Sequence, residues 1–235
     1  MLVLICRVPV DAAAQCPPPE PAGREVKYVR DSAEYGTLTR QAYRLAARAV
    51  AVARAGAAPG QPWTVVIDVD ETALDNTVYQ LERAAYKLPF DDGSWNAWVR
   101  RAEAPAVPGA VEFVRGVRAS GGRIAWISNR DEVTREPTRR NLAAVGLWDD
   151  GDRLCLATEA GYTKAVRRRE VATGQGSCAW GGTPAPVLVF VGDQMGDFPA
   201  QGEDLPGAGS DEVFGTRFFL LPNPMYGAWT AAVTR

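Results

Sequence analysis

The sequence has 235 residues, of which 46% are hydrophobic and 23% are charged, so it is long enough for one domain with a substantial core. Its 28 acidic and 26 basic residues give a net charge of −2, without the basic surplus with which proteins bind a nucleic-acid polymer. The chain contains no histidine, which excludes a Ser-His-Asp triad, phosphohistidine chemistry and histidine-based metal centres. Catalysis must therefore use carboxylates, lysine, arginine, hydroxyl groups or a cation bound by oxygen.

Residues 1–24 are interpreted as a signal-like, Pro-rich leader. A short apolar run is followed by Ala12-Ala13-Ala14, which resembles a small-residue cleavage site. This pattern predicts a protein that is secreted, periplasmic or associated with the outer membrane. Cys16 would carry a lipid anchor, but Gln15 stands where a lipobox has a small residue, so anchoring is left open. No stretch approaches the roughly 20 apolar residues of a transmembrane helix.

The remainder, residues 25–235, is predicted to form one α/β domain. The segment TLTRQAYRLAARAVAVARAG has apolar residues at helical spacing and predicts an amphipathic helix that ends near Gly56. Four short, β-branched apolar runs follow, with helical patterns between them: WTVVI (63–67), RIAWI (123–127), RLCLA (153–157) and PVLVFV (186–191). Unalternated runs of this kind suit strands buried on both faces. The expected fold is a Rossmann-like, doubly wound parallel sheet.

The segment from about residue 71 to 107 interrupts this alternation and is predicted to form a small, mainly helical cap. It is rich in aromatic residues: Tyr79, Tyr86, Phe90, Trp95 and Trp98. One or two of these rings are expected to face a ligand. Most of the others are expected to fill the core of a small helical extension.

Two of the four cysteines, Cys155 and Cys178, lie in the body of the domain. Export would allow them to form a disulfide. The alternative is a pair of buried free thiols, because the sequence does not give the distance that decides between the two.

Polar side chains follow the predicted strands at the edge where α/β sheets bind ligands. They are Asp68, Asp70, Glu71 and Thr72 after the first run, Ser128, Asn129, Arg130 and Asp131 after the second, Lys164 beyond the third, and Asp193 and Asp197 after the fourth. An acidic residue in such a place can simply cap a helix. Carboxylates gathered at one edge would repel each other, however, unless a divalent cation lay among them, and Mg²⁺ suits oxygen ligands. An ammonium group at the mouth of this site is suited to holding phosphate, whereas its alternative is a solvated helix end.

Several of these segments match one known family. VVIDVDETALDN, WISNRDE, Lys164 with the arginines after it, VGDQMGDF and FGTRFFLLPNPMYGAW resemble, in order, the signatures of bacterial class B and C acid phosphatases related to outer-membrane lipoprotein e. These enzymes belong to the haloacid dehalogenase superfamily, and the resemblance runs from about residue 25 to 230. It implies Mg²⁺-dependent hydrolysis of phosphomonoesters through an aspartyl phosphate. Asp68 would be the nucleophile and Asp70 the general acid and base.

The resemblance also implies the ligand sets. Mg²⁺ would be held by Asp68, the backbone carbonyl of Asp70 and Asp193, while Asp197 would order metal-bound water. The phosphoryl oxygens would be bound by Ser128, Asn129 and Lys164.

The small-molecule substrates implied by the resemblance are nucleoside 5′-monophosphates, including nicotinamide mononucleotide. Tyr79, Trp95 and Tyr226 are the candidates for stacking on the base, although Trp95 could instead be cap core and the turn around Tyr226 purely structural. Relatives suggest a homodimer. Two alternatives stay open, namely a phosphotransferase on the same scaffold and a non-catalytic binding or storage protein.

Overall fold

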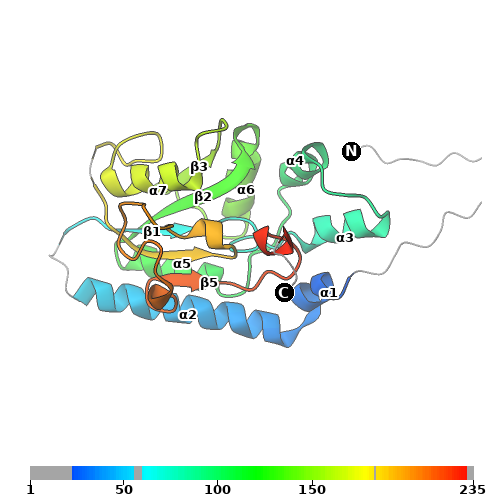
Figure 1. The fold of residues 1–235 in the computed structure, drawn as a ribbon, viewed down its shortest axis with the longest axis horizontal. Helices are drawn as coiled ribbons and strands as arrows, with labels where there is room; N and C mark the ends of the chain where they lie inside the picture. The colour runs from blue at the N-terminus through cyan, green and yellow to red at the C-terminus, as the bar shows by residue number, and fades with distance from the viewer. Residues whose placement is uncertain (1–22, 56–59, 183, 232–235) are drawn as a thin grey trace, which may run out of the picture.

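A five-stranded parallel sheet forms the centre of the protein in the computed structural model, which describes residues 23–55, 60–182 and 184–231 (Figure 1). The strand order is β3-β2-β1-β4-β5. Their bounds are β1 (Thr64–Ile67), β2 (Arg123–Asp131), β3 (Arg153–Ala157), β4 (Val187–Gly192) and β5 (Phe218–Leu220). The four predicted strands and the doubly wound α/β fold are confirmed. The leader, including Cys16, lies outside the described residues except for its last two positions.

Helices cover both faces of the sheet. Their bounds are α1 (Arg24–Asp31), α2 (Ala33–Ala55), α3 (Thr77–Ala85), α4 (Asp92–Arg101), α5 (Ala110–Ala119), α6 (Arg135–Ala144) and α7 (Lys164–Thr173). Short 3-10 turns are η1 (Glu132–Thr134), η2 (Met195–Asp197), η3 (Asp211–Val213) and η4 (Ala228–Ala231). The predicted amphipathic helix is α2, which ends at Ala55. None of the helices in the described ranges is long and apolar enough to cross a membrane.

Two apolar layers hold the helices to the sheet. Because side chains alternate along a strand, Val65 and Ile67 of β1 pack toward α2 and α5, while Val66 packs into the opposite layer with Val171 of α7. Figure 1 shows α2 and α7 on opposite faces of the sheet. All of these side chains are at least 95% buried. This two-sided burial explains why the strands have no alternation of polar and apolar residues.

The register of the sheet brings the predicted site residues to one edge. Ile67, at the end of β1, lies beside Val191 of β4, and the Asp68 N–H donates to the Val191 carbonyl at 3.0 Å. Since the two strands are parallel, the acidic residues that follow each of them leave the sheet together. The second strand differs from prediction, because it continues through Asp131 past an irregularity in its pairing with β3.

The segment predicted as a cap, residues 71–107, contains α3 and α4, which lie at one end of the sheet in Figure 1, where α3 contacts α1 and α4 contacts α6. The Tyr79 ring packs edge-on against Trp95, with centroids 5.1 Å apart, and against Phe90 at 6.4 Å. Trp98 is buried and donates its indole N–H to Asn76 at 2.8 Å. Tyr86 and Phe90 are exposed. Part of the aromatic content therefore forms the core of the helical pair.

The two cysteines of the domain are joined. A disulfide links Cys155 on β3 to Cys178 in the segment after α7, closing a loop with a sequence separation of 23. Both residues are 2% exposed. Of the two alternatives left open by the sequence, the structure therefore has the disulfide and not the pair of free thiols.

Candidate active site

Asp68 leaves the end of β1 and is 6% exposed. Its Oδ1 accepts a hydrogen bond from the ammonium group of Lys164. Burial raises the pKa of Asp68 well above its ordinary value, Lys164 opposes this shift, and the nearby carboxylates of Asp197 and Asp193 add to it. A charged Asp68 therefore depends on positive charge close by.

Asp193 follows β4 and is 8% exposed. Its Oδ2 accepts from the Asn223 amide at 2.7 Å, and its Oδ1 accepts from the Thr72 hydroxyl at 3.1 Å. Burial and the charge of Asp197 raise the pKa of Asp193 to about 6. The two neutral donors fix the orientation of the carboxylate without neutralising it.

Asp197 lies in η2, on the loop that returns toward β4. Its Oδ2 accepts the backbone N–H groups of Asp193 at 3.0 Å and Gln194 at 2.9 Å. The approach is so close that a Cβ added at Gly192 would lie 2.3 Å from the Asp197 Cβ. A residue with a side chain at position 192 would collide with Asp197, so the close packing of this site residue requires a glycine there.

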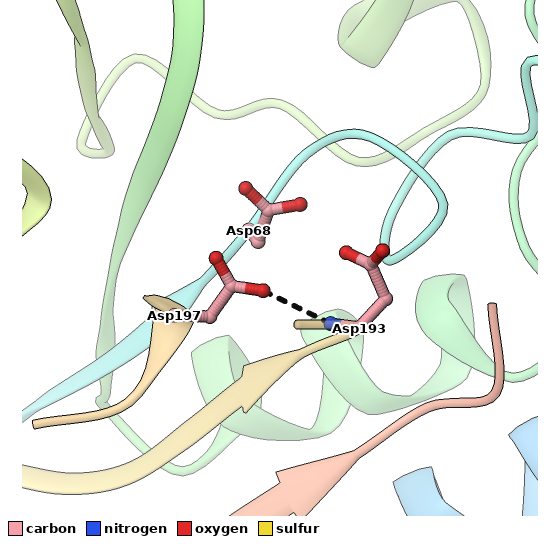
Figure 2. Close-up of side chains that lie close together, drawn as sticks. All are labelled: Asp68, Asp193 and Asp197. Carbon is pink, nitrogen blue, oxygen red and sulfur yellow. Dashed lines mark hydrogen bonds between the residues drawn. The ribbon is translucent and has the colours of Figure 1, made fainter. Parts of the chain in front are cut away.

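The carboxylates of Asp68, Asp193 and Asp197 form one buried group, with an oxygen of each within 4.8 Å of the others. Figure 2 shows them gathered where β1 and β4 end. Burial and the neighbouring carboxylates raise the pKa of Asp68 and of Asp193, and a hard divalent cation among the three side chains would remove that repulsion. The donor set is oxygen only, so the residues present fit Mg²⁺ or a similar ion. The Asp70 carboxylate does not belong to this group.

Lys164 is the first residue of α7, after an N-cap formed by the Thr163 hydroxyl. Its Nζ contacts both Asp68 and Asp197, the latter at 2.5 Å, and its side chain is 13% exposed. Burial disfavours the ammonium charge, but Asp68 and Asp197 outweigh it and hold the pKa of Lys164 above its ordinary value. Lys164 is not a solvated helix end, since it stands inside the acidic group.

Asp70 is held by three neighbouring side chains. Arg130 donates to it at 2.8 Å from Nη2 and at 3.0 Å from Nε, and the Asn76 amide donates at 3.0 Å. The Ser128 hydroxyl donates to Oδ2 at 3.1 Å. Arg130 is itself 2% exposed, and the sequence placed it after the second strand without a role in the site. The sequence feature that could have indicated a role for Arg130 was its position in WISNRDE, directly after the predicted phosphate-binding residues Ser128 and Asn129.

Ser128 and Asn129 lie on the last part of β2 and meet the rest of the site differently. Ser128 is fully buried, and its Oγ accepts the Arg130 N–H at 3.1 Å. Asn129 is exposed, and its Oδ1 accepts from Arg167 Nη2 at 2.7 Å. Both residues lie on the strand next to β1, while their role in binding phosphate stays a prediction.

The three predicted stacking residues do not share one environment. Tyr79 is 2% exposed and its hydroxyl lies 3.0 Å from the Ser94 hydroxyl, so its ring has no free face for a ligand in this structure. Trp95 is half-buried, with the Arg130 guanidinium 5.8 Å from its ring centroid. Tyr226 is also half-buried and donates its hydroxyl to Glu71.

Glu71 directly follows Asp70 and was noted among the polar residues after the first strand, but no role was predicted for it. It is 1% exposed and accepts the Asn76 N–H at 3.0 Å. Burial raises its pKa well above the ordinary value, and the charges of Asp70 and Asp193 add to this effect. Its backbone has a φ of +57°, which is unusual for a residue with a side chain. The turn that carries Asp70 is therefore both buried and conformationally restricted.

Comparisons with known proteins agree on one family. The model of the HAD superfamily, subfamily IIIB (acid phosphatase), matches residues 8–229. The chain is 27% identical over 162 residues to acid phosphatase 1 of Solanum lycopersicum, and 25% identical over 167 residues to a stem 31 kDa glycoprotein of Glycine max. Each alignment covers 68% of this chain but 57% and 58% of those relatives, so the chain spans just over half of their length.

Solved structures show the same likeness. The class C acid phosphatase from Bacillus anthracis is 26% identical, with a TM-score of 0.72 over 88% of this chain and 85% of that one. A structure of that enzyme with tungstate bound gives a TM-score of 0.73.

Proposed function

The chain belongs to the HAD superfamily, subfamily IIIB (acid phosphatase), as its motifs predicted, and we propose that it hydrolyses phosphomonoesters through an aspartyl phosphate. The observation that carries this proposal is the buried group of Asp68, Asp193 and Asp197 with the Lys164 ammonium inside it, and Asp70 follows Asp68 by two residues. Phosphoryl transfer needs placed charge more than it needs elaborate covalent chemistry, and this arrangement concentrates both signs of charge at one point.

In the first step, an oxygen of Asp68 attacks phosphorus while the bond from phosphorus to the leaving oxygen breaks. The nucleophile and the phosphate are both anionic and repel each other. Lys164 Nζ, which donates to Asp68 Oδ1, reduces this repulsion.

Asp70 gives its proton to the leaving oxygen in the first step. In the second step it takes a proton from the water that attacks phosphorus, and the bond to Asp68 breaks. Arg130, Ser128 and Asn76 fix the orientation of the Asp70 carboxylate, and the two-pronged contact from Arg130 restrains it most.

A divalent cation held by the three buried carboxylates, which we propose to be Mg²⁺, would supply charge that offsets that of the phosphoryl group. One similar structure has tungstate bound, and tungstate is a tetrahedral oxyanion like phosphate. That likeness supports the binding of a phosphate-like anion by this chain.

The proposed substrates are nucleoside 5′-monophosphates. Trp95 lies beside Arg130, which pairs with Asp70, and Tyr226 is tied to Glu71 in the same turn. Two half-buried rings therefore lie close to the group that protonates the leaving oxygen, which supports stacking on the base of the nucleoside that leaves with that oxygen. Tyr79 is not included, because its ring is enclosed in the cap.

We also propose that the protein works outside the cytoplasm. The disulfide between Cys155 and Cys178 is the kind of bond that persists in oxidising compartments. The leader, whose structure is not described, was predicted from the sequence alone. Fractionation of cells that express the full chain would test this, and retention of the whole protein in the cytoplasm with both thiols reduced would refute it.

A panel of phosphomonoesters with Mg²⁺ or with EDTA tests the proposed activity. We expect turnover that EDTA removes and that Asp68→Asn abolishes while the circular dichroism spectrum is unchanged. Failure of the wild-type protein to hydrolyse any phosphomonoester with Mg²⁺ would refute the proposal.

The substrate class is tested separately with Trp95→Ala and Tyr226→Ala. If these rings stack on the base, each variant should lose roughly 1–3 kcal/mol of binding with nucleotides and little with a small alkyl phosphate. An equal loss on both substrates would instead indicate a packing role.

A further inference from the structure

We propose that Arg167 and Arg168 are positioning residues, each of which fixes one half of the active site to the helix that carries Lys164. Arg167 would hold the β2 end, defined as Ser128 and Asn129, and Arg168 would hold the acidic loop, defined as residues 193–197. The proposal rests on the proposed function, because it assigns phosphate binding to the β2 end and metal binding to the acidic loop.

Helix geometry places these arginines on the side of α7 that faces the site. They follow Lys164 by three and four residues, and positions with this spacing lie on one helix face. Arg167 is 1% exposed and Arg168 is 3% exposed. The next residue, Arg169, is exposed, so three consecutive arginines have two different environments.

Arg167 is bound to the β2 end by two donors. Its Nη1 donates to the Ser128 carbonyl at 2.5 Å, and its Nη2 donates to Asn129 Oδ1 at 2.7 Å. Nη1 also reaches the Cys155 carbonyl on β3 at 3.0 Å, and Nε reaches the Thr163 carbonyl at 3.2 Å. The Asn129 amide oxygen is thereby occupied, which leaves the amide N–H groups to point elsewhere, including toward an anion.

Arg168 makes the corresponding contacts with the acidic loop. Its Nη1 donates to the Gly196 carbonyl at 3.0 Å, directly before Asp197. Its Nε donates to Glu203 Oε2 at 3.0 Å, and the ion pair with Glu203 is largely buried, with side chains 4% and 14% exposed. Glu203 thus holds the guanidinium in place, and the guanidinium holds the loop.

Only a guanidinium can make these contacts together. Each arginine uses a planar fork to reach acceptors in different directions, whereas a lysine would present one point of charge. Because α7 also carries Lys164, which contacts Asp68 and Asp197, one rigid helix sets the distance between the phosphate-binding end and the metal-binding loop.

The test uses Arg167→Lys and Arg168→Lys in the full chain, with Arg169→Lys as the matched control on the same helix. Three quantities are measured for each: the thermal midpoint, the affinity of metal-free protein for Mg²⁺ by calorimetry, and the inhibition constant of inorganic phosphate at saturating Mg²⁺. If a buried lysine prevents folding, the same three quantities are measured for Arg167→Gln and Arg168→Gln. Glu203→Gln tests the Arg168 contact without changing the arginine.

We expect the two arginine variants to weaken the binding of different ligands. Arg168→Lys and Glu203→Gln should weaken Mg²⁺ binding, by about tenfold or more for the arginine variant, as is usual when groups that orient metal ligands are lost. Arg167→Lys should weaken inhibition by phosphate and leave Mg²⁺ binding as in the control.

Three results would count against these expectations in different ways. Variants that lose thermal stability but bind Mg²⁺ and phosphate like Arg169→Lys would show a merely structural role and overturn the proposal. Equal weakening of both ligands by both variants would overturn the division between the halves. Wild-type protein that binds neither Mg²⁺ nor phosphate would refute the proposed function itself, and the positioning roles with it.

Discussion

Asp193→Asn should make the metal-free protein more stable at neutral pH, although it removes a residue of the active site. Burial and the charge of Asp197 raise the pKa of Asp193 from 3.8 to about 6. The folded protein therefore holds this proton more tightly than the unfolded chain does. The stabilising contribution of the protonated group is fully present below about pH 4, and it is lost as the pH rises through about 6.

The size of the effect follows from the two pKa values. A rise from 3.8 to about 6 corresponds to about 3 kcal/mol between pH 4 and pH 7.5. An asparagine carries no charge; its oxygen can accept from the Asn223 amide and its N–H can donate to the Thr72 hydroxyl oxygen, so it should avoid most of this loss. For a chain of this size, 1 kcal/mol moves the thermal midpoint by about 2–4 °C, so the expected gain in EDTA at pH 7.5 is several degrees.

The assay is urea unfolding of both proteins in EDTA at pH 4.5 and pH 7.5, repeated at pH 7.5 with Mg²⁺. The variant should be the more stable of the two in EDTA at pH 7.5, and the difference should shrink at pH 4.5. Mg²⁺ should stabilise the wild type more than the variant, because binding to the folded state adds stability only where the site is intact. A variant that is less stable than the wild type in EDTA, with the same dependence on pH, would refute the reasoning.

Three further predictions concern other parts of the molecule. Gly192→Ala should raise the Mg²⁺ concentration needed for half-maximal activity, since its Cβ would meet Asp197 at 2.3 Å; an unchanged metal titration would contradict this. Arg130→Lys should slow hydrolysis of an alkyl phosphate more than that of p-nitrophenyl phosphate, because the poorer leaving group depends more on protonation by Asp70; comparison of kcat on the two substrates checks this. Cys178→Ser should cost about 3 kcal/mol in urea unfolding, as expected for a loop of this length, and reductant should bring the wild type to the same value.

The parts of the site that lie directly after strands could be predicted from the sequence. Asp68, Asp193 and Asp197 follow apolar runs, and parallel strands necessarily end at a common edge. Lys164 was found because it is one of only three lysines and begins a helix. In these cases, local pattern and sheet topology together determine the position of the side chain.

Arg167 and Arg168 could not be selected in the same way. The chain has 23 arginines, and RRR at 167–169 gives no sign that two are buried and one is exposed. Their burial depends on acceptors contributed by segments far away in the chain. Tyr79 shows the same limit, since the direction of a ring on a cap helix is set by packing against the next helix. The strand β5 was missed because three residues are too few to show a pattern.

The ammonium of Lys164 gives the acidic group an internal counter-ion. Three carboxylates and one ammonium leave two negative charges, which a single divalent cation balances and a monovalent cation does not. For the proposed metal site, this charge balance among four side chains favours a divalent ion over a monovalent one. Exchange of Lys164 for a neutral residue would change that balance and with it the class of ion that the site prefers.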